Sequence, residues 1–568
     1  MRRANLLPRF ALLAGVAAGL PALFGCLKHP LKPVTYQAEI EKERLIDLVI
    51  NRDVDVLFVI DNSGSMGEEQ GKLAENFQNF IEVLEDPDVK ANYRIGVTTT
   101  DVFNPQCGTS TSPENGKLQF SSCRARENDF IFDPGGQNVD KFEEACTNTC
   151  EHDVIDVIPT ATEVDNDKDE RRWLENQEGT LNVEDITATE AFQCIGPQGI
   201  NGCGFESQLE AMYMALRLSD DAQSQQYGFI RQDAILAVVH VTDEGDCSFN
   251  KDYQEIFTDQ ESPFWHEDAG TRAYSSICFN AGVKCTGDGA PYSDCVSQNY
   301  DVDGDETNDE DEAVLHPISR YIDQLNGLEA EKKKNNQNQE VIVSVLGGVP
   351  EGYEDGQDLY YEAGSNEDQL QFGIGPGCTS GVGGELQKAT PPVRMRQWAE
   401  VFSPDERNLF SICASNYGPA LDAIANKIKE QIRPACYEQC ARDLDQQAPG
   451  LQIQCNIIES PSDGEDRAIE ECVRDGENGP YEWEDEDYVV PDGEDVCYAV
   501  LSDKEGQTED EHDDMSDECK EKSWNLEFKL RRRPGAPAKP GTAVRATCSL
   551  SEVPEIDCKK GDDDDDED

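Results

Sequence analysis

The stretch Asp55-Val-Leu-Phe-Val-Ile-Asp61-Asn-Ser-Gly-Ser65 decides the fold. Its first half is a continuous apolar run, of the kind found in strands that are buried on both faces of a parallel sheet. Its second half places short polar side chains where that strand ends. Between Leu73 and Leu84 apolar residues then recur at helical spacing. The stretch therefore predicts a buried strand, a polar loop and an amphipathic helix.

The same alternation of apolar runs and helical patterns continues along the chain. Further strands are predicted at 93–99, 234–241, 341–346 and 408–412, and further helices at 209–216 and 421–432. Strands that alternate with helices are typical of an α/β protein with a doubly wound, mostly parallel sheet. In such sheets ligands bind at the carboxyl ends of the strands.

Oxygen-bearing side chains stand at two of those ends. Asp61, Ser63 and Ser65 form a D-x-S-x-S motif after the first strand, and Thr242-Asp243 follows the strand at 234–241. Carboxylate and hydroxyl oxygens are hard ligands that suit Mg²⁺, Mn²⁺ or Ca²⁺. The sequence therefore predicts a divalent-cation site at this edge of the sheet.

This pattern resembles the von Willebrand factor type A domain and its metal-ion-dependent adhesion site. In that family an Asp and two Ser come from one loop, a Thr from a second and an Asp from a third. The resemblance covers about residues 51–435 and implies a Rossmann-like fold. It also implies a cation with one coordination position open to a carboxylate of a partner, either another protein or an extracellular matrix ligand.

The second loop departs from the family, because Glu206 stands where the metal-site Thr is expected. The implied ligands are thus Asp61, Ser63, Ser65, Glu206 and Asp243. An added carboxylate favours Ca²⁺ or Mn²⁺ and could satisfy the cation internally, which would weaken the binding of an acidic partner. The whole pattern resembles a lipid-anchored, cysteine-rich group of bacterial proteins with this domain.

The N-terminal residues indicate export. Residues 1–25 have the form of a lipoprotein signal peptide, and Leu23-Phe24-Gly25-Cys26 resembles a lipobox whose cysteine receives the lipid. The alternatives are an ordinary signal peptide or a membrane-spanning helix. Leu27, in place of the Asp that retains lipoproteins in an inner membrane, favours an outer-membrane anchor, facing the periplasm or the exterior.

Charge and cysteine content narrow the function further. Lys and Arg number 48 against 116 Asp and Glu, a net charge of −68, which excludes nucleic acid as a partner. Of 21 cysteines, 20 remain beside Cys26 and are compatible with ten disulfides in an oxidising compartment. A zinc site at Cys146-x3-Cys150 or Cys436-x3-Cys440 is the alternative.

A second acidic stretch, residues 301–312, has the spacing of a calcium loop. Its oxygen-bearing side chains occupy positions 1, 3, 5, 7, 9 and 12, as in an EF-hand, although position 6 lacks the usual glycine. The alternative is a solvated acidic loop. The predicted ligands are Asp301, Asp303, Asp305, Thr307, Asp309 and Glu312.

These patterns divide the chain into five parts. After the signal peptide come a lipidated cysteine and tether at 26–52, the α/β domain at 53–435 with insertions at about 102–200 and 247–338, a cysteine-rich acidic β domain at 436–560, and an acidic tail at 561–568. Alternating residues at 524–530 and 544–550 predict two antiparallel strands in a small disulfide-stapled module.

No nucleophile, zinc-protease or phosphate-loop motif occurs, so we do not expect an enzyme. His240 lies inside a predicted strand and is expected in the core. We expect a membrane-anchored, exported protein that binds a divalent cation and mediates metal-dependent protein binding or adhesion at the bacterial envelope. The alternative is an envelope scaffold or assembly factor with a structural calcium. A hydrolase using Asp61, Glu206 and Asp243 is more remote.

Overall fold

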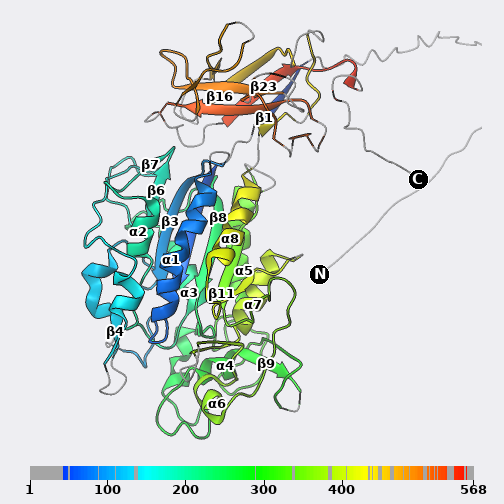
Figure 1. Ribbon diagram of the computed structural model, residues 1–568. Helices are drawn as coiled ribbons and strands as arrows, with labels where there is room; N and C mark the ends of the chain where they lie inside the picture. The colour runs from blue at the N-terminus through cyan, green and yellow to red at the C-terminus, as the bar shows by residue number, and fades with distance from the viewer. Residues whose placement is uncertain are drawn as a thin grey trace, which may run out of the picture. The chain divides into compact units, whose positions relative to one another are not determined.

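A computed structural model (Figure 1) describes residues 43–48 and 52–558 with internal gaps. The predicted signal peptide, Cys26 and the acidic tail lie outside the described residues. The gaps fall at 87–88, 109–110, 133–137, 288, 335–338, 382–386, 405, 433–434, 438, 445–450, 461–465, 477–478, 485–486, 503–507, 509, 511, 517–518, 521, 523, 534–535, 537–542 and 555–557.

A seven-stranded sheet in the order β14-β11-β8-β2-β3-β6-β7 forms the centre of the α/β part. The first five strands are parallel, and β6 and β7 extend one edge in antiparallel fashion. The five strands predicted from apolar runs are all present. The bounds are β2 Asp53–Ile60, β3 Asn92–Thr99, β6 Leu174–Gln177, β7 Thr180–Leu181, β8 Ile235–Val241, β11 Ile342–Gly347 and β14 Leu409–Ser411.

Helices cover both faces of this sheet (Figure 1). Val56 and Phe58 of β2 belong to the core under α1, α2 and α8, whereas Leu57 and Val59 belong to the core under α3, α5 and α7. This two-sided burial explains why β2 is apolar at every position from Val56 to Ile60. The bounds are α1 Gly67–Leu84, α2 Ala188–Ile195, α3 Gln208–Ser219, α5 Ile318–Lys332, α7 Val393–Ala399 and α8 Gly418–Gln431.

Short elements and disulfides build the long insertions. Helix α5 lies within the stretch predicted as the second insertion, yet its Tyr321 and Leu325 pack in the core beneath the sheet. The remaining elements are η1 Cys123–Phe130, β4 Ile131–Phe132, β5 Val139–Asp140, η2 Glu143–Thr147, η3 Lys251–Phe257, α4 Ser276–Gly282, β9 Val283–Thr286, β10 Asp294–Ser297, α6 Asn366–Phe372, β12 Cys378–Ser380, β13 Gln387–Ala389 and η4 Glu400–Phe402.

The C-terminal part is built of β-strands, as predicted, but the two predicted strands do not pair with each other. Strand β22 pairs with β15 and β21, and β23 pairs with β1 and β16 in a separate sheet. Strand β1, Glu43–Leu48, lies inside the predicted tether. The bounds are β15 Ala435–Cys436, β16 Cys455–Ser460, β17 Arg467–Ala468, β18 Glu470–Glu471, β19 Trp483–Glu484, β20 Asp487–Tyr488, β21 Val496–Leu501, β22 Glu527–Arg532 and β23 Ala543–Ser549.

Ten disulfides join the 20 cysteines that follow Cys26, so the predicted number is confirmed. The alternative, a zinc site, is excluded at both candidate pairs, because each of their cysteines is bonded to a distant cysteine and offers no thiolate. The pairs are 107–203, 123–146, 150–194, 247–278, 285–295, 378–413, 436–519, 440–558, 455–548 and 472–497.

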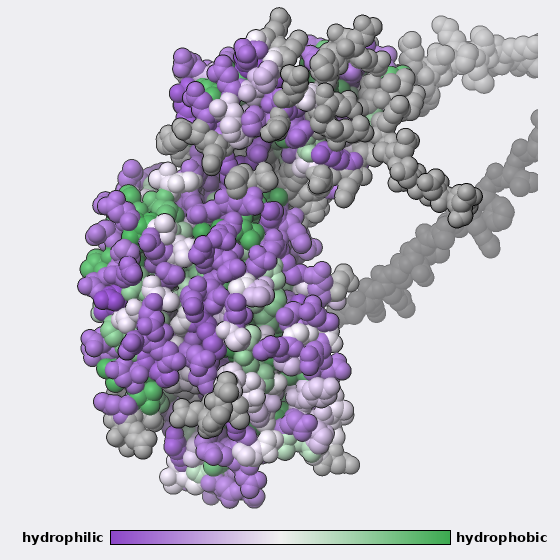
Figure 2. Space-filling view, viewed as in Figure 1, coloured by the Kyte–Doolittle hydropathy of each residue, from purple (hydrophilic) through white to green (hydrophobic). Residues whose placement is uncertain are grey.

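The surface matches the acidic composition. Hydrophilic residues dominate the face of the protein that Figure 2 shows, with small separate apolar spots. Within the described part of the chain, no helix has both the length and the apolar character needed to cross a membrane.

Candidate metal centre

Strands β2 and β8 are neighbours and end at the same edge of the sheet, which brings two of the predicted loops together. The Asp61 N–H donates to the carbonyl of Val241 at 2.9 Å. The Asp61 side chain is fully buried, and its Oδ1 accepts the backbone N–H of Ser63 at 2.8 Å. Its Oδ2 accepts the Thr242 hydroxyl at 2.6 Å. Neutral donors therefore hold this carboxylate in one orientation.

The two serines of the motif lie beside it, and one of them reaches solvent. Ser63 is buried and Ser65 is exposed, and their hydroxyl oxygens are 3.2 Å apart. The Ser65 side chain also interacts with Asp243, whose Oδ1 is buried and accepts no hydrogen bond. The structure thus brings together four of the five predicted ligands on two adjacent loops, with a path to solvent at Ser65.

Glu206, the fifth predicted ligand, reaches the same cluster from the loop before α3. Its carbonyl accepts the N–H of Cys247 at 2.7 Å, which fixes this loop to the one after β8. Its side chain is 1% exposed, and neither carboxylate oxygen has a hydrogen-bond partner that meets normal geometry. Glu206 instead faces Asp61 and Glu244. A buried carboxylate in such surroundings is costly to ionise.

The electrostatics of the cluster show that its carboxyl groups need a counter-charge. Burial raises the pKa of Asp61, Glu206 and Asp243, and neighbouring carboxylates raise those of Glu206 and Asp243 further. Burial, followed by the charge of Asp61, raises the pKa of Glu244 to about 7. Among the described residues, no lysine or arginine is a main influence on any of these four groups. Their counter-charge must be a proton or a cation from outside the chain.

The donor set fits a hard divalent cation. Within the described part of the chain, no three carboxylates bring ligand oxygens within 4.8 Å of one another. A cation held here would therefore take hydroxyl oxygens together with carboxylates, as the Ser63 and Ser65 positions allow. The three side chains that do lie that close, Cys123, Cys146 and Cys150, are all in disulfides.

Gln70 of α1 and Gly202 position the loops around the cluster. The Gln70 side-chain amide donates to the carbonyls of Asp61 and Gly199, both at 2.8 Å. The N–H of Gly202 donates to the carbonyl of Asn62 at 2.8 Å. A Cβ at Gly202 would lie 2.2 Å from the Asn62 side-chain oxygen, so a larger residue there would push the two loops apart.

The sequence pattern pointed to Thr242 without giving it a role in the cluster, and it did not point to Glu244. Both belong to the run Thr-Asp-Glu-Gly-Asp that follows β8, so their position after a buried strand was the available signal. A second carboxyl that the sequence pattern did not reveal is Asp101, just beyond β3. Burial and the charge of Glu114 raise its pKa to about 7.

His240 lies in the core, as expected. It is fully buried on β8 and stands edge-on to Trp398, with ring centroids 5.2 Å apart. Burial lowers its pKa to about 3, so it is neutral and is not placed to act as a base at the cluster.

The predicted calcium loop is a separate region. Asp301 Oδ1 accepts the N–H groups of Asp303 and Asp305, both at 3.0 Å. Thr307 is buried and donates to Glu312 Oε2 at 3.4 Å. The side chains of Asp303, Asp305, Asp309 and Glu312 are exposed, and strand β10, not a helix, precedes the loop. Calcium binding here stays a prediction.

Comparisons with known proteins place the chain in no named family. No family description matches it, and no curated protein matches it. A weak likeness exists to the pilus adhesin SpaC from Lactobacillus rhamnosus GG in its open conformation, with 10% identity over 87% of this chain and 38% of that chain and a TM-score of 0.25. Another exists to the pilus adhesin RrgA from Streptococcus pneumoniae, with 10% identity over 90% of this chain and 58% of that chain and a TM-score of 0.25. The chain thus spans less than two thirds of either protein. Likenesses this weak do not define a shared fold.

Proposed function

We propose that this protein is an exported, lipid-anchored protein of the bacterial envelope with a von Willebrand factor type A domain. The domain binds a divalent cation through Asp61, Ser63, Ser65, Glu206 and Asp243, and the cation binds a carboxylate of a partner protein. Ten disulfides support an oxidising location outside the cytoplasm.

One observation carries the proposal: three buried carboxyls, Asp61, Glu206 and Asp243, and the half-buried Glu244 share one edge of the sheet without a cationic side chain among their main influences. Placing like charges in a poorly solvated site is unfavourable unless a counter-ion is present. A divalent cation supplies that charge and accepts the oxygen ligands that the loops offer.

The exposed hydroxyl of Ser65 supports partner binding over a purely internal role. A cation next to an exposed ligand keeps a face toward solvent, where a partner's Asp or Glu can coordinate. Glu206 argues against partner binding, because a third protein carboxylate completes more of the coordination shell of the cation. This residue favours the rival function, a calcium-stabilised envelope scaffold.

The test asks whether the bound cation has an open position. Protein loaded with Mn²⁺ is titrated with N-acetyl-aspartate methylamide, and the relaxation rate of water protons is followed. We expect the rate to fall as the carboxylate displaces metal-bound water, whereas the asparagine analogue leaves it unchanged. An unchanged rate with both compounds would contradict partner binding.

The double variant Ser63→Ala/Ser65→Ala separates the two functions. Under the adhesion function it loses the response to the aspartate probe and keeps nearly the melting temperature of the parent protein. Under the scaffold function its melting temperature falls. A variant that changes neither property shows that these serines do not hold a cation.

A further inference from the structure

The start of helix α3 is anchored to the loop after β8. Its N-cap residue, Ser207, makes no side-chain cap hydrogen bond. The N–H of Leu209 in the first turn donates instead to Asp246 Oδ1 at 3.1 Å, and the Ser207 hydroxyl donates to the carbonyl of Cys247 at 2.9 Å. The loop after β8 therefore supplies an acceptor that a helix normally takes from its own N-cap, and it holds the first turn of α3 beside it.

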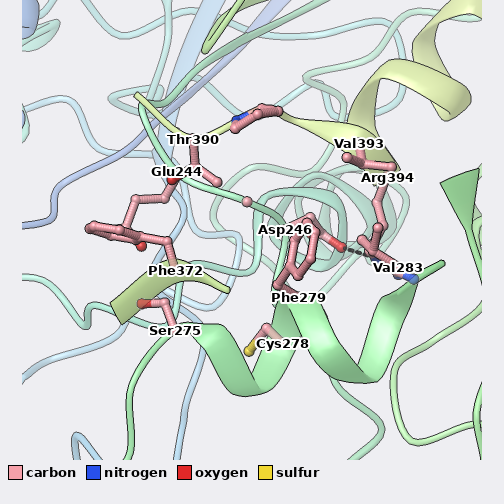
Figure 3. A pocket seen from close by; sticks show the side chains of 12 residues that line it. Glu244, Asp246, Ser275, Cys278, Phe279, Val283, Phe372, Thr390, Val393 and Arg394 are labelled. Atoms are coloured by element: carbon pink, nitrogen blue, oxygen red, sulfur yellow. Dashed lines mark hydrogen bonds and ion pairs between the residues drawn. The ribbon is translucent and has the colours of Figure 1, made fainter. Parts of the chain in front are cut away.

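A buried ion pair holds this anchor in place. Asp246 Oδ2 accepts Arg394 Nε at 3.0 Å, the pair joined by a dashed line in Figure 3. Arg394 also donates to the carbonyl of His316 at 2.7 Å. Both charged side chains line a small hollow beside Glu244, between α4, α6 and the start of α7 (Figure 3). Because Asp246 and Arg394 are buried, the first turn of α3 has a firm support.

Gln208, in this first turn, reaches the predicted cation site through hydrogen bonds. Its Nε2 donates to the Thr242 hydroxyl oxygen at 2.9 Å. Thr242 in turn donates to Asp61 Oδ2 at 2.6 Å. All three side chains are fully buried, so bulk water does not compete for these hydrogen bonds. Gln208, Thr242 and Asp61 thus form a chain of hydrogen bonds from α3 to a predicted ligand.

The partners of Thr242 fix the direction of this chain. A threonine hydroxyl has one hydrogen to donate and two lone pairs that accept. Thr242 Oγ1 accepts from Gln208 Nε2 and from the N–H of Glu244, the latter at 3.2 Å. Its single hydrogen goes to Asp61, since a carboxylate that binds a cation can only accept. Thr242 has no lone pair left for a cation, so it orients Asp61 and is not itself a ligand.

The surroundings of Gln208 separate its role from a purely structural one. Its Oε1 is buried and accepts no hydrogen bond from the described residues. An unpaired polar atom in a buried site costs free energy of folding, and an apolar side chain of similar shape avoids that cost. We therefore expect Gln208→Met to keep or raise the stability of the protein, although it removes the donor to Thr242.

We propose that Gln208 is a positioning residue of the cation site: through the Thr242 hydroxyl, it holds the Asp61 carboxylate in the orientation that binds the cation. The proposal rests on the proposed function in one respect, the cation that Asp61 binds. It adds that helix α3, which follows Glu206 in the chain, positions ligands on two loops of the site. Replacing a residue that orients a metal ligand typically lowers metal affinity by about 10–100-fold.

Calorimetric titration with Ca²⁺ tests the effect on affinity, and urea unfolding in EDTA measures stability. We expect Gln208→Met to weaken Ca²⁺ binding about tenfold without loss of stability. The matched control is Gln339→Met, at a buried glutamine that also has an unpartnered Oε1 and donates to the carbonyl of Asp233 at 3.3 Å. This control should keep the affinity of the parent protein. An unchanged affinity in Gln208→Met, or an equal loss in Gln339→Met, overturns the proposal.

Variants at Thr242 test whether Gln208 acts through this hydroxyl. Thr242→Ser keeps the hydroxyl and should bind Ca²⁺ nearly as the parent protein does, whereas Thr242→Val keeps the shape and should weaken binding. The double variant Gln208→Met/Thr242→Val should lose no more affinity than Thr242→Val alone, because the chain of hydrogen bonds is already broken. Losses that add in the double variant overturn the proposal.

A readout without the cation keeps this proposal separate from the proposed function. Asp61 Oδ1 accepts the N–H of Ser63 at 2.8 Å, so the NMR shift of that amide proton in EDTA reports the orientation of the carboxylate. Gln208→Met should move this signal upfield, and Gln339→Met should not. A parent protein that binds no cation contradicts the proposed function, while the Ser63 amide still decides whether Gln208 positions Asp61. An unmoved Ser63 signal in Gln208→Met overturns that role.

Discussion

Strand β2 begins and ends beside buried aspartates that are neutralised in different ways. Asp55, near its start, accepts Arg231 Nε at 2.8 Å, and the charges of Arg231, Lys332 and Arg94 all lower its pKa against the effect of burial. Asp61, just past its end, is equally buried and accepts only neutral donors. At the amino edge of the sheet the chain supplies the counter-charge, and at the carboxyl edge it does not.

The two edges of the sheet therefore differ in how their buried carboxylates are neutralised, and this difference indicates a structural role for one edge and a binding role for the other. A buried ion pair made within the chain forms when the protein folds, and both its desolvation penalty and its Coulombic gain come from the chain itself. Carboxylates without such a partner depend on a species from outside, so that their stability varies with pH and with dissolved cations. The predictions that follow test this contrast.

The largest effect is expected at the amino edge. Arg231→Leu leaves the fully buried Asp55 without its main counter-charge and should lower the free energy of unfolding by about 3–5 kcal/mol. The loss should be the same in Ca²⁺ and in EDTA, since no outside ion reaches this pair. Urea unfolding of the oxidised protein measures it. The exposed Arg217→Leu is the control and should change stability by less than about 0.5 kcal/mol.

A cation should act at the carboxyl edge alone. At a free Ca²⁺ or Mg²⁺ concentration of about 100 times Kd, the free energy of unfolding should rise by about 2.7 kcal/mol. Asp243→Asn should abolish this gain, and in EDTA it should be at least as stable as the parent protein because one of several crowded carboxyls is neutral. Equal stabilisation of both proteins by the cation would place the binding elsewhere.

The dependence of stability on pH should differ with and without the cation. The raised pKa values of Glu244 and Asp101, each about 7, mean that the folded protein keeps protons which the unfolded chain has lost above about pH 4. In EDTA the free energy of unfolding should therefore fall between pH 5 and pH 8, by at most about 1.4 kcal/mol per pH unit for each such group.

Saturating Ca²⁺ should reduce or reverse this fall, because the cation binds the ionised carboxylates. Urea midpoints at four pH values, each with and without chelator, measure both slopes. A stability independent of pH in EDTA would mean that the cluster is solvated and needs no counter-ion.

The smallest effect is expected in the acidic loop at 301–312, whose carboxylates face solvent. Asp303→Asn/Asp305→Asn should change the free energy of unfolding in EDTA by less than about 0.5 kcal/mol. If the predicted calcium loop is occupied, the same variant lowers the number of bound Ca²⁺ ions by one. An unchanged number of ions would identify the loop as a solvated acidic surface.

Much of the sheet could be predicted because its strands leave a simple signal. The run from Val56 to Ile60 is fully buried on both sides of the sheet, so every position in it favours an apolar side chain. Because the D-x-S-x-S loop comes directly after this strand in the sequence, it must lie at the carboxyl end of the strand. The carboxyl ends of parallel strands meet at one edge of the sheet, which is why the sequence alone predicts that Asp61 and Asp243 lie close together.

What could not be predicted depends on contacts between distant segments. Glu244 and the hollow beside it require α4, α6 and the start of α7 to converge, and none of these short helices has a pattern that reveals its neighbours. Strands β22 and β23 were predicted, but β22 pairs with β21 and β23 pairs with β16 and β1, so the two strands lie in different sheets. Disulfide connectivity, which removed the zinc alternative, is likewise a property of the folded chain.

Calorimetric titration with Ca²⁺ and with Mg²⁺ tests the central claim, that the counter-charge of the carboxyl edge is a cation. It is made on the oxidised protein from residue 27 onward and on its Asp243→Ala variant, with Asp303→Asn/Asp305→Asn as the matched control. We predict a binding event that is present in the parent protein and the control and absent in Asp243→Ala. The same isotherm for the parent protein and Asp243→Ala would contradict the claim and would leave the four carboxyls of the cluster to be neutralised by protons alone.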